Sequence, residues 1–355
     1  MLPVVCALVL VQSGTSADAD LKVIDALQEP SVTADTDIPK YLAECEEIAE
    51  KRGALIMKFY KQYPTHGRTP SLLASRWDGF FGHVRVPKLP VLDRIKSDVA
   101  TFLKSRPLPA NREPARRYQA KEQVLREWRL MLDAKVKAED PAATAYITRG
   151  RKACESFRRE YPANDAGVFL LYSLSEMASG SPKGRDILKL MGDWYPKTNL
   201  GKGAAGKLRL LDAVGKPFEL EFTDFTTGAK VSIADMKGKV VLVDFWATWC
   251  GPCRKDIEKE MLPMYRELHP KGLEIVGISG DVPGDQGRKM LADYIKEQSI
   301  PWPNLWDGKG PNDGTPLSWG ISSWPTQFLV DKKGILRYTS DTEDRRKTIE
   351  ALLAE

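Results

Sequence analysis

Cysteine and long apolar runs are both scarce in this sequence, and their scarcity excludes several classes of protein. Five cysteines among 355 residues are too few for a fold built on disulfides. The longest apolar run, residues 2–11, falls short of the ~20 residues needed to span a bilayer. Lys and Arg (53) exceed Asp and Glu (48) only slightly, so the charge gives no reason to expect a nucleic-acid partner.

Cofactor signatures are also missing. The sequence contains no Walker loop, no glycine-rich dinucleotide turn and no CxxCH haem site, so no cofactor is expected. What is present is an ordinary globular composition, with 42% hydrophobic residues, which is enough to bury a core. At about 150 residues per domain, the length predicts roughly two domains.

The apolar run at residues 2–11 resembles a secretory signal, because small and polar residues follow it as far as Ala17. No Lys or Arg precedes the run, and a buried strand or helix is the alternative. Export would make residues 1–17 a signal peptide and remove Cys6 with it. The apolar run therefore predicts an exported, periplasmic or cell-envelope protein.

Residues 18–37 are expected to be a linker, and residues 38–200 a helical domain. Stretches at 41–63, 117–137 and 142–161 carry apolar residues at helical spacing, and prolines separate them.

A short motif recurs in this helical region. Phe-x-x-x-Tyr-Pro ends at Pro64 and again at Pro162, and a Tyr-Pro pair ends at Pro196, 34 residues further on. That spacing is the period of tetratricopeptide repeats. The region is expected to be either a set of degenerate helix-hairpin repeats or an irregular helical domain with proline stops.

A second linker is expected at residues 201–212, within a segment rich in Gly and Lys. The pattern then changes to strands and helices. The expected order is strands at 218–222, 230–233 and 240–245, a helix at 250–268, a strand at 274–279, a helix at 287–298, strands at 326–330 and 335–338, and a helix at 343–353. This order predicts an α/β domain over residues 213–355, with a central mixed sheet flanked by helices.

The motif Cys250-Gly251-Pro252-Cys253 lies where the most apolar strand passes into a helix. Unpaired backbone N–H groups and the helix dipole stabilise a thiolate at such a position. Pro252 suits the first helical turn, and Cys253 lies within disulfide reach of Cys250. We predict that Cys250 is the exposed nucleophile and Cys253 the more buried resolving thiol of a redox pair that passes through a mixed disulfide.

Zinc binding is the alternative for a CxxC pair, because zinc sites use the same spacing. Zinc would need two further Cys or His ligands, and this part of the chain offers only His269. No metal is therefore expected.

The sequence VDFWATWCGPC at residues 243–253 resembles the active-site signature of the thioredoxin superfamily. Three further segments extend the resemblance to TlpA/ResA-type thiol–disulfide oxidoreductases of the redoxin (AhpC/TSA) group: GKPF at 215–218, WPNLWD at 302–307 and WPTQFLVD at 324–331. The match runs from about residue 211 to the C-terminus. It implies a thioredoxin-like fold.

The resemblance also implies roles for two acids. Asp244 occupies the position of a buried acid that relays a proton to or from the resolving cysteine, and a carboxylate in an apolar strand is expected to have a raised pKa. Asp256 lies where relatives carry a Glu with a similar role. The alternatives are an Asp244 satisfied by a local partner and an Asp256 that is solvated near a helix N-terminus.

Five residues are expected on the substrate side of the site. The resemblance implies that Pro325 is a cis-proline facing the disulfide, with the preceding backbone pairing with the substrate. Trp324 is bulkier than the usual residue there and is expected to narrow access. Trp249, Gly251 and Pro252 complete this set.

The predicted function is thiol–disulfide oxidoreductase, acting as a reductase on disulfide-containing client proteins and recharged by a membrane or soluble dithiol donor. A thiol-dependent peroxidase is one alternative, although Thr248 is spaced wrongly for the Pro-x-x-x-Thr-x-x-Cys context. A redox-modulated helical scaffold that binds a partner protein is another. Cys45 and Cys154 are expected either to pair or to stay as free thiols.

Overall fold

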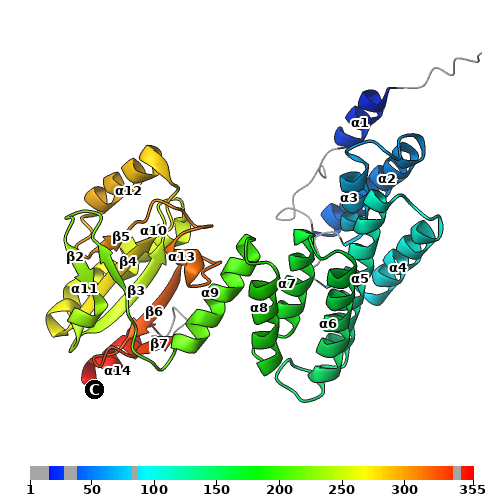
Figure 1. Ribbon diagram of the computed structural model, residues 1–355. Coiled ribbons are helices and arrows are strands. Elements are labelled where there is room, and N and C mark those ends of the chain that lie inside the picture. Colours follow the sequence, from blue (N-terminus) through cyan, green and yellow to red (C-terminus); the bar gives the residue numbers. More distant parts are fainter. Residues whose placement is uncertain (1–15, 28–37, 82–85, 339–344) are drawn as a thin grey trace, which may run out of the picture. The chain divides into compact units, whose positions relative to one another are not determined.

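The computed structural model describes residues 16–27, 38–81, 86–338 and 345–355. The chain divides into two compact units, residues 1–183 and 184–355 (Figure 1). Most of the predicted signal peptide lies outside the described residues. No helix among the described residues is long and apolar enough to cross a membrane.

The predicted linker at 18–37 is partly wrong, because helix α1 (Ala17–Asp25) occupies its beginning. Ser16 caps this helix by accepting a hydrogen bond from the Ala19 amide. Leu21 and Ile24 are buried in the core of the first unit, so one face of the segment is apolar enough to pack.

Helices form all of the regular structure described in the first unit, which confirms the helical prediction. They are α1, α2 (Ile38–Gln62), α3 (Thr69–Phe81), α4 (Leu89–Lys104), α5 (Pro109–Asp133), α6 (Ala143–Glu160), the 3₁₀ turn η1 (Asp165–Gly167) and α7 (Val168–Met177). The recurring motif has a structural basis: the rings of Phe59 and Tyr63 lie 4.9 Å apart, and those of Phe157 and Tyr161 lie 5.1 Å apart. Each pair closes a helix just before a proline.

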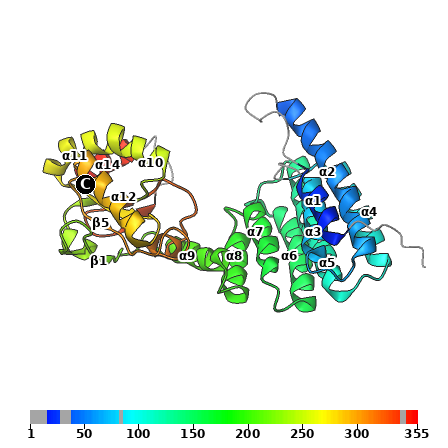
Figure 2. The same ribbon diagram turned by 90° about the horizontal axis from the view of Figure 1, so that it is seen from above.

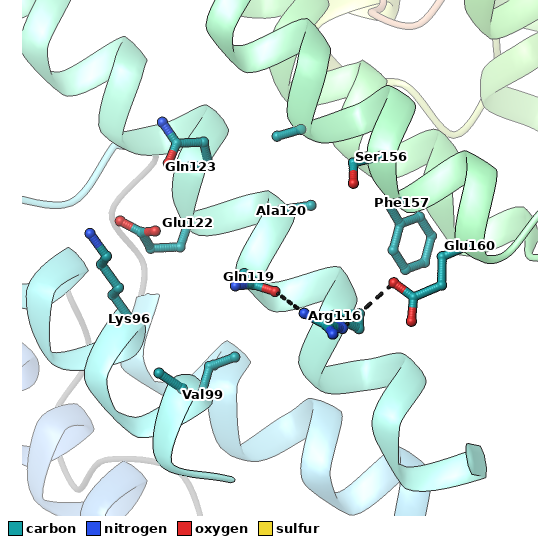
Figure 3. A pocket seen from close by; sticks show the side chains of 12 residues that line it. Lys96, Val99, Arg116, Gln119, Ala120, Glu122, Gln123, Ser156, Phe157 and Glu160 are labelled. Atoms are coloured by element: carbon teal, nitrogen blue, oxygen red, sulfur yellow. Dashed lines mark hydrogen bonds and ion pairs between the residues drawn. The ribbon is translucent and has the colours of Figure 1, made fainter. Parts of the chain in front are cut away.

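A cavity of about 420 Å³ lies among α4, α5 and α6 in this unit (Figure 3). Arg116 is drawn between Gln119 and Glu160, donating to the Gln119 side chain at 2.9 Å and lying 3.5 Å from the Glu160 carboxylate. The lining carries both acidic and basic side chains, so it favours no single charge of ligand.

The second unit is built on a five-stranded sheet in the order β5-β4-β3-β6-β7. Its strands are β3 (Val240–Trp246), β4 (Leu273–Ser279), β5 (Asn304–Leu305), β6 (Thr326–Val330) and β7 (Leu336–Tyr338). The neighbours β3, β4 and β5 are parallel, whereas β6 and β7 run antiparallel. A separate hairpin pairs β1 (Glu221–Thr223) with β2 (Lys230–Ser232) and leads into the turn η2 (Ile233–Met236). The predicted mixed sheet is confirmed.

Helices flank this sheet. They are α10 (Gly251–Asp256), the π-helical turn η3 (Ile257–Met261), α11 (Leu262–Leu268), the 3₁₀ turn η4 (His269–Lys271), α12 (Gly284–Gln298), α13 (Thr315–Ser318) and α14 (Arg345–Ala354). Successive residues of β3 alternate between two cores: Leu242 and Trp246 join Cys253, whereas Val243 and Phe245 join the other cluster. In Figure 2, α10, α11 and α14 gather on one side of the unit.

The predicted linker at 201–212 is wrong. Helix α8 (Pro182–Trp194) is followed by α9 (Asn199–Ala213), and Leu210 of α9 is buried in the core that includes Val243 and Phe245. Gly206 of α9 allows close packing against α13. A Cβ on Gly206 would overlap the backbone of Leu317 and Gly320, so only glycine lets α9 lie this close to α13.

Candidate active site

Cys250 and Cys253, the two residues of the predicted redox pair, form a disulfide at the start of α10. Their Cα atoms lie 5.2 Å apart. Cys250 is the N-cap residue, and its Sγ accepts a hydrogen bond from the Cys253 amide at 3.1 Å. Cys250 is 5% exposed and Cys253 is 1% exposed, so the first sulfur is the more accessible of two largely buried ones. An amide aimed at Cys250 Sγ favours its thiolate form.

The helix that carries the pair changes its winding after Asp256. The π-helical turn η3 is followed by α11, with Pro263 at its first positions. Pro263 has no amide hydrogen to give to a carbonyl one turn back, and the wider turn occurs just before it. Sequence spacing predicts one helix over 250–268, and the structure gives three helical segments.

Asp244 lies in the middle of β3, on the face that Leu242 and Trp246 share with the disulfide. It is 1% exposed. Burial raises the pKa of its carboxyl to about 7; a hydrogen bond from Gln327 opposes this rise, the charge of Asp256 adds to it, and the charge of Arg345 opposes it. This carboxyl can therefore both hold and release a proton near neutral pH.

A network of side chains joins Asp244 to Asp256. Gln327 lies opposite Asp244 across the β3–β6 pairing, and its Nε2 donates to Asp244 at 2.8 Å and to Asp256 at 3.0 Å. Arg345, at the start of α14, holds both oxygens of Asp256 at 2.6 and 2.9 Å and donates to Gln327 Oε1 at 2.7 Å. The alternative of a solvated Asp256 is thus wrong.

Neither Gln327 nor Arg345 is among the residues predicted from sequence. Gln327 gives a signal, because it is polar within the apolar strand 326–330 and faces the buried Asp244. Arg345 gives none, because it begins a run of three basic residues that reads as an ordinary solvated helix face.

A second buried acid fixes the loop before Cys250. Asp281 is 1% exposed and accepts hydrogen bonds from the Thr248 amide, the Thr248 hydroxyl and the Ser279 hydroxyl. Burial raises the pKa of Asp281, and its bonds to Thr248 and Ser279 oppose that rise. The loop is therefore tied to the end of β4.

We expect Thr248→Val to destabilise the sheet of the second unit by about 2 kcal/mol, because it removes a hydroxyl donor from the buried Asp281. Hydrogen exchange of β3 peptides, read by mass spectrometry, measures this loss. Thr101→Val is the control, since Thr101 is exposed and bonds only a carbonyl of its own helix; it should stay within about 0.5 kcal/mol. Equal losses in the two variants would contradict the role of Asp281.

The five predicted substrate-side residues differ in exposure, and Trp324 packs against the core cluster that contains Cys250 and Cys253. Gly251 and Pro252 are exposed, Trp324 and Pro325 are half-buried, and Trp249 is 46% exposed. The Trp249 and Trp324 rings meet edge to face at 5.5 Å, and Trp249 Nε1 donates to the Gly280 carbonyl at 3.3 Å. The Trp324–Pro325 peptide bond is cis, as expected. The surface beside Cys250 is therefore largely aromatic.

Cys45 and Cys154 are not paired with each other. Cys45 is partly exposed and Cys154 is buried, and both are free thiols. Burial raises the pKa of Cys154 to about 12, which makes it a poor nucleophile. Within the described ranges, no group of three or more His, Cys, Asp or Glu side chains is arranged to hold a metal ion.

Comparison with known proteins agrees with this site. Residues 213–339 match the AhpC/TSA family. The thiol–disulfide oxidoreductase ResA of Bacillus thuringiensis subsp. konkukian is 31% identical over 36% of this chain and 68% of that protein. The thiol:disulfide interchange protein HelX of Rhodobacter capsulatus is 36% identical over 28% of this chain and 52% of that protein.

A solved structure, the thioredoxin domain of a thiol–disulfide oxidoreductase from Bacteroides vulgatus, is 30% identical with a TM-score of 0.34 over 40% of this chain and 98% of that one. The family match at residues 213–339 covers the disulfide, the cis-proline and the buried acids. Through that part, this chain belongs to the AhpC/TSA family and is a ResA-type thiol–disulfide oxidoreductase.

Proposed function

We propose that the protein reduces disulfides of client proteins and is recharged by a dithiol donor. The observation that carries this proposal is the Cys250–Cys253 disulfide at a helix start, with the titratable Asp244 on the sheet face beneath it. The dithiol form of a thioredoxin-type CGPC pair is a strong reductant, and the potential of the couple is near −270 mV in thioredoxin itself.

The first step uses the accessible sulfur. Cys250 thiolate attacks one sulfur of a client disulfide, the client S–S bond breaks, and one client cysteine leaves as a thiolate. The Cys253 amide, which points at Cys250 Sγ, stabilises the attacking anion. The exposed Trp249 and the half-buried Trp324 that contacts it support binding of an apolar client segment beside that sulfur.

The second step uses the buried sulfur and Asp244. The Cys253 thiol passes its proton to the Asp244 carboxylate, and the resulting thiolate attacks Cys250 Sγ. The mixed disulfide breaks and the second client cysteine leaves as a thiolate. Two electrons have passed to the client, and the protein is left with its own disulfide, which a dithiol donor reduces by the reverse sequence.

Cys253→Ala should trap this intermediate, because the client bound to Cys250 can no longer be displaced. We expect covalent adducts of the variant with a disulfide-containing test protein on non-reducing gels, released by added thiol. The double variant with Cys250→Ser should form none. Adducts of equal yield in the double variant, or none in either, would contradict the proposal.

The peroxidase alternative and the docking role of the helical unit are tested by separate measurements. Consumption of hydrogen peroxide with a regenerating dithiol tests the peroxidase alternative. We also propose that the helical unit docks a partner protein, which capture experiments test. The apolar residues 2–11 support an exported, periplasmic or cell-envelope location, which cell fractionation tests.

A further inference from the structure

Arg345 has an environment that is unusual for an arginine. Its residue is 4% exposed, although its neighbour Arg346 is half exposed and pairs at the surface with Glu267 and Glu350. A buried guanidinium loses its hydration and must be compensated by close partners. Here the partners are Asp256 and Gln327, and the Gln327 amide also donates to both Asp244 and Asp256.

The contacts determine how the Gln327 amide is oriented. Arg345 has only donors, so the Gln327 atom that it binds at 2.7 Å must be the carbonyl oxygen Oε1. The amide nitrogen then faces the two carboxylates, and Gln327 Nε2 donates to both Asp244 and Asp256. Without Arg345 the amide would be free to turn over.

The same contacts distinguish the two acids. Both oxygens of Asp256 are held by the Arg345 fork, a geometry that binds the carboxylate form. Asp244 contacts no such cation within the described part of the chain, and its hydrogen-bond partner is the neutral Gln327 amide. Two neighbouring carboxylates otherwise share a proton, and their titrations merge.

We propose that Arg345 is a positioning residue for the proton transfer. It binds both carboxyl oxygens of Asp256 and orients Gln327, so that Asp244 is the acid that exchanges the proton with Cys253. This inference rests on the proposed function, because it assigns Asp244 the relay role described above. Among the residues that the structure describes, the charged groups that act on Asp244 are Asp256 on α10 and Arg345 on α14, and Glu260 on η3 acts on Arg345.

These charges determine the direction in which each substitution shifts the titration midpoint. Arg345→Met leaves the two carboxylates without their cation, so the midpoint pH at which the pair titrates should rise by about one unit or more. Asp256→Asn removes the like charge and should lower the titration of Asp244. The double variant removes both opposing charges and should stay within about half a unit of the unmodified protein.

The test is a pH titration of ¹³C-labelled Asp side-chain carboxyls by NMR on the oxidised protein. It needs no client and no exchange activity, so it remains informative if the proposed function fails. Arg346→Met is the matched control, because it removes an exposed arginine from the same helix and should leave the titration unchanged. Arg345→Lys should fall between Arg345→Met and the unmodified protein, since lysine restores charge but not the fork.

A titration in Arg345→Met equal to that of the unmodified protein would overturn the inference. If this variant does not fold, the double Arg345→Met/Asp256→Asn variant keeps the test valid, because it leaves no unpaired buried charge. A shift of more than one unit in the double variant would then overturn it. In a folded Arg345→Met protein, the rate of the resolving step should show the same upward shift in its pH profile.

Discussion

We expect Asp244→Asn to stabilise the second unit and to slow the resolution of mixed disulfides strongly. The pKa of this carboxyl is near 7 in the folded protein against 3.8 for the free group. The folded state therefore binds the proton more tightly, and between these two values the group destabilises the fold increasingly as pH rises. Asparagine does not ionise and can still accept the Gln327 hydrogen bond.

The stability gain should therefore be absent at pH 4 and reach the order of 4 kcal/mol at pH 8. Hydrogen exchange of the β3 peptides at the two pH values measures it. Asp235→Asn is the control, since Asp235 is exposed, and it should change neither value. A loss of stability at pH 8 would show that Asp244 is satisfied as an anion in the fold.

The same variant should resolve mixed disulfides about 10²- to 10⁴-fold more slowly, the range that positioned acid–base groups contribute. Stopped-flow release of a client from a preformed Cys250 adduct isolates this step from the initial attack. Raising the pH should partly restore the rate, because hydroxide can then remove the Cys253 proton. An unchanged rate across the pH range would exclude Asp244 as the relay.

The second large effect is expected in α9, from Gly206→Ala. In an exposed helix this change stabilises by about 1 kcal/mol, because alanine is the better helix former. Here the new Cβ would meet the backbone of Leu317 and Gly320, neither of which can rotate away. We expect a net loss of at least ~3 kcal/mol from the second unit.

Gly203→Ala on the same helix is the matched control. Its Cβ would meet only the Cδ1 methyl of Leu317, at 3.3 Å, and that side chain can shift. This variant should be neutral or slightly stabilised. Both are measured by hydrogen exchange of peptides from α9 and β3. Equal behaviour of the two variants would mean that the α9–α13 contact does not hold this face of the sheet.

The fold of the second unit could be predicted well because its signals are local. The apolar run of β3 and the helix start at Cys250 lie within a few residues of each other, and hydrophobic periodicity reports on such neighbours. The cis bond before Pro325 could be expected only from the family resemblance, since an X–Pro bond is usually trans.

The predictions that failed depend on long-range packing. Gly201 and Gly206 suggest a flexible linker from composition alone, whereas in the structure they let a helix approach neighbouring backbone. The site was predicted incompletely for the same reason. Arg345 contacts Asp256, which lies 89 residues away in sequence. A basic residue at the start of a polar helix is usually solvated, so the sequence does not indicate a buried partner.

The origin of Arg345 in α14 has a consequence for biosynthesis. A ribosome produces Asp244 and Asp256 well before α14, so the growing chain has both acids and both cysteines while Arg345 is still untranslated. The acid pair cannot be buried at low cost until α14 has left the exit tunnel. Closure of this domain over its redox centre therefore waits until α14 has been synthesised, well after both cysteines.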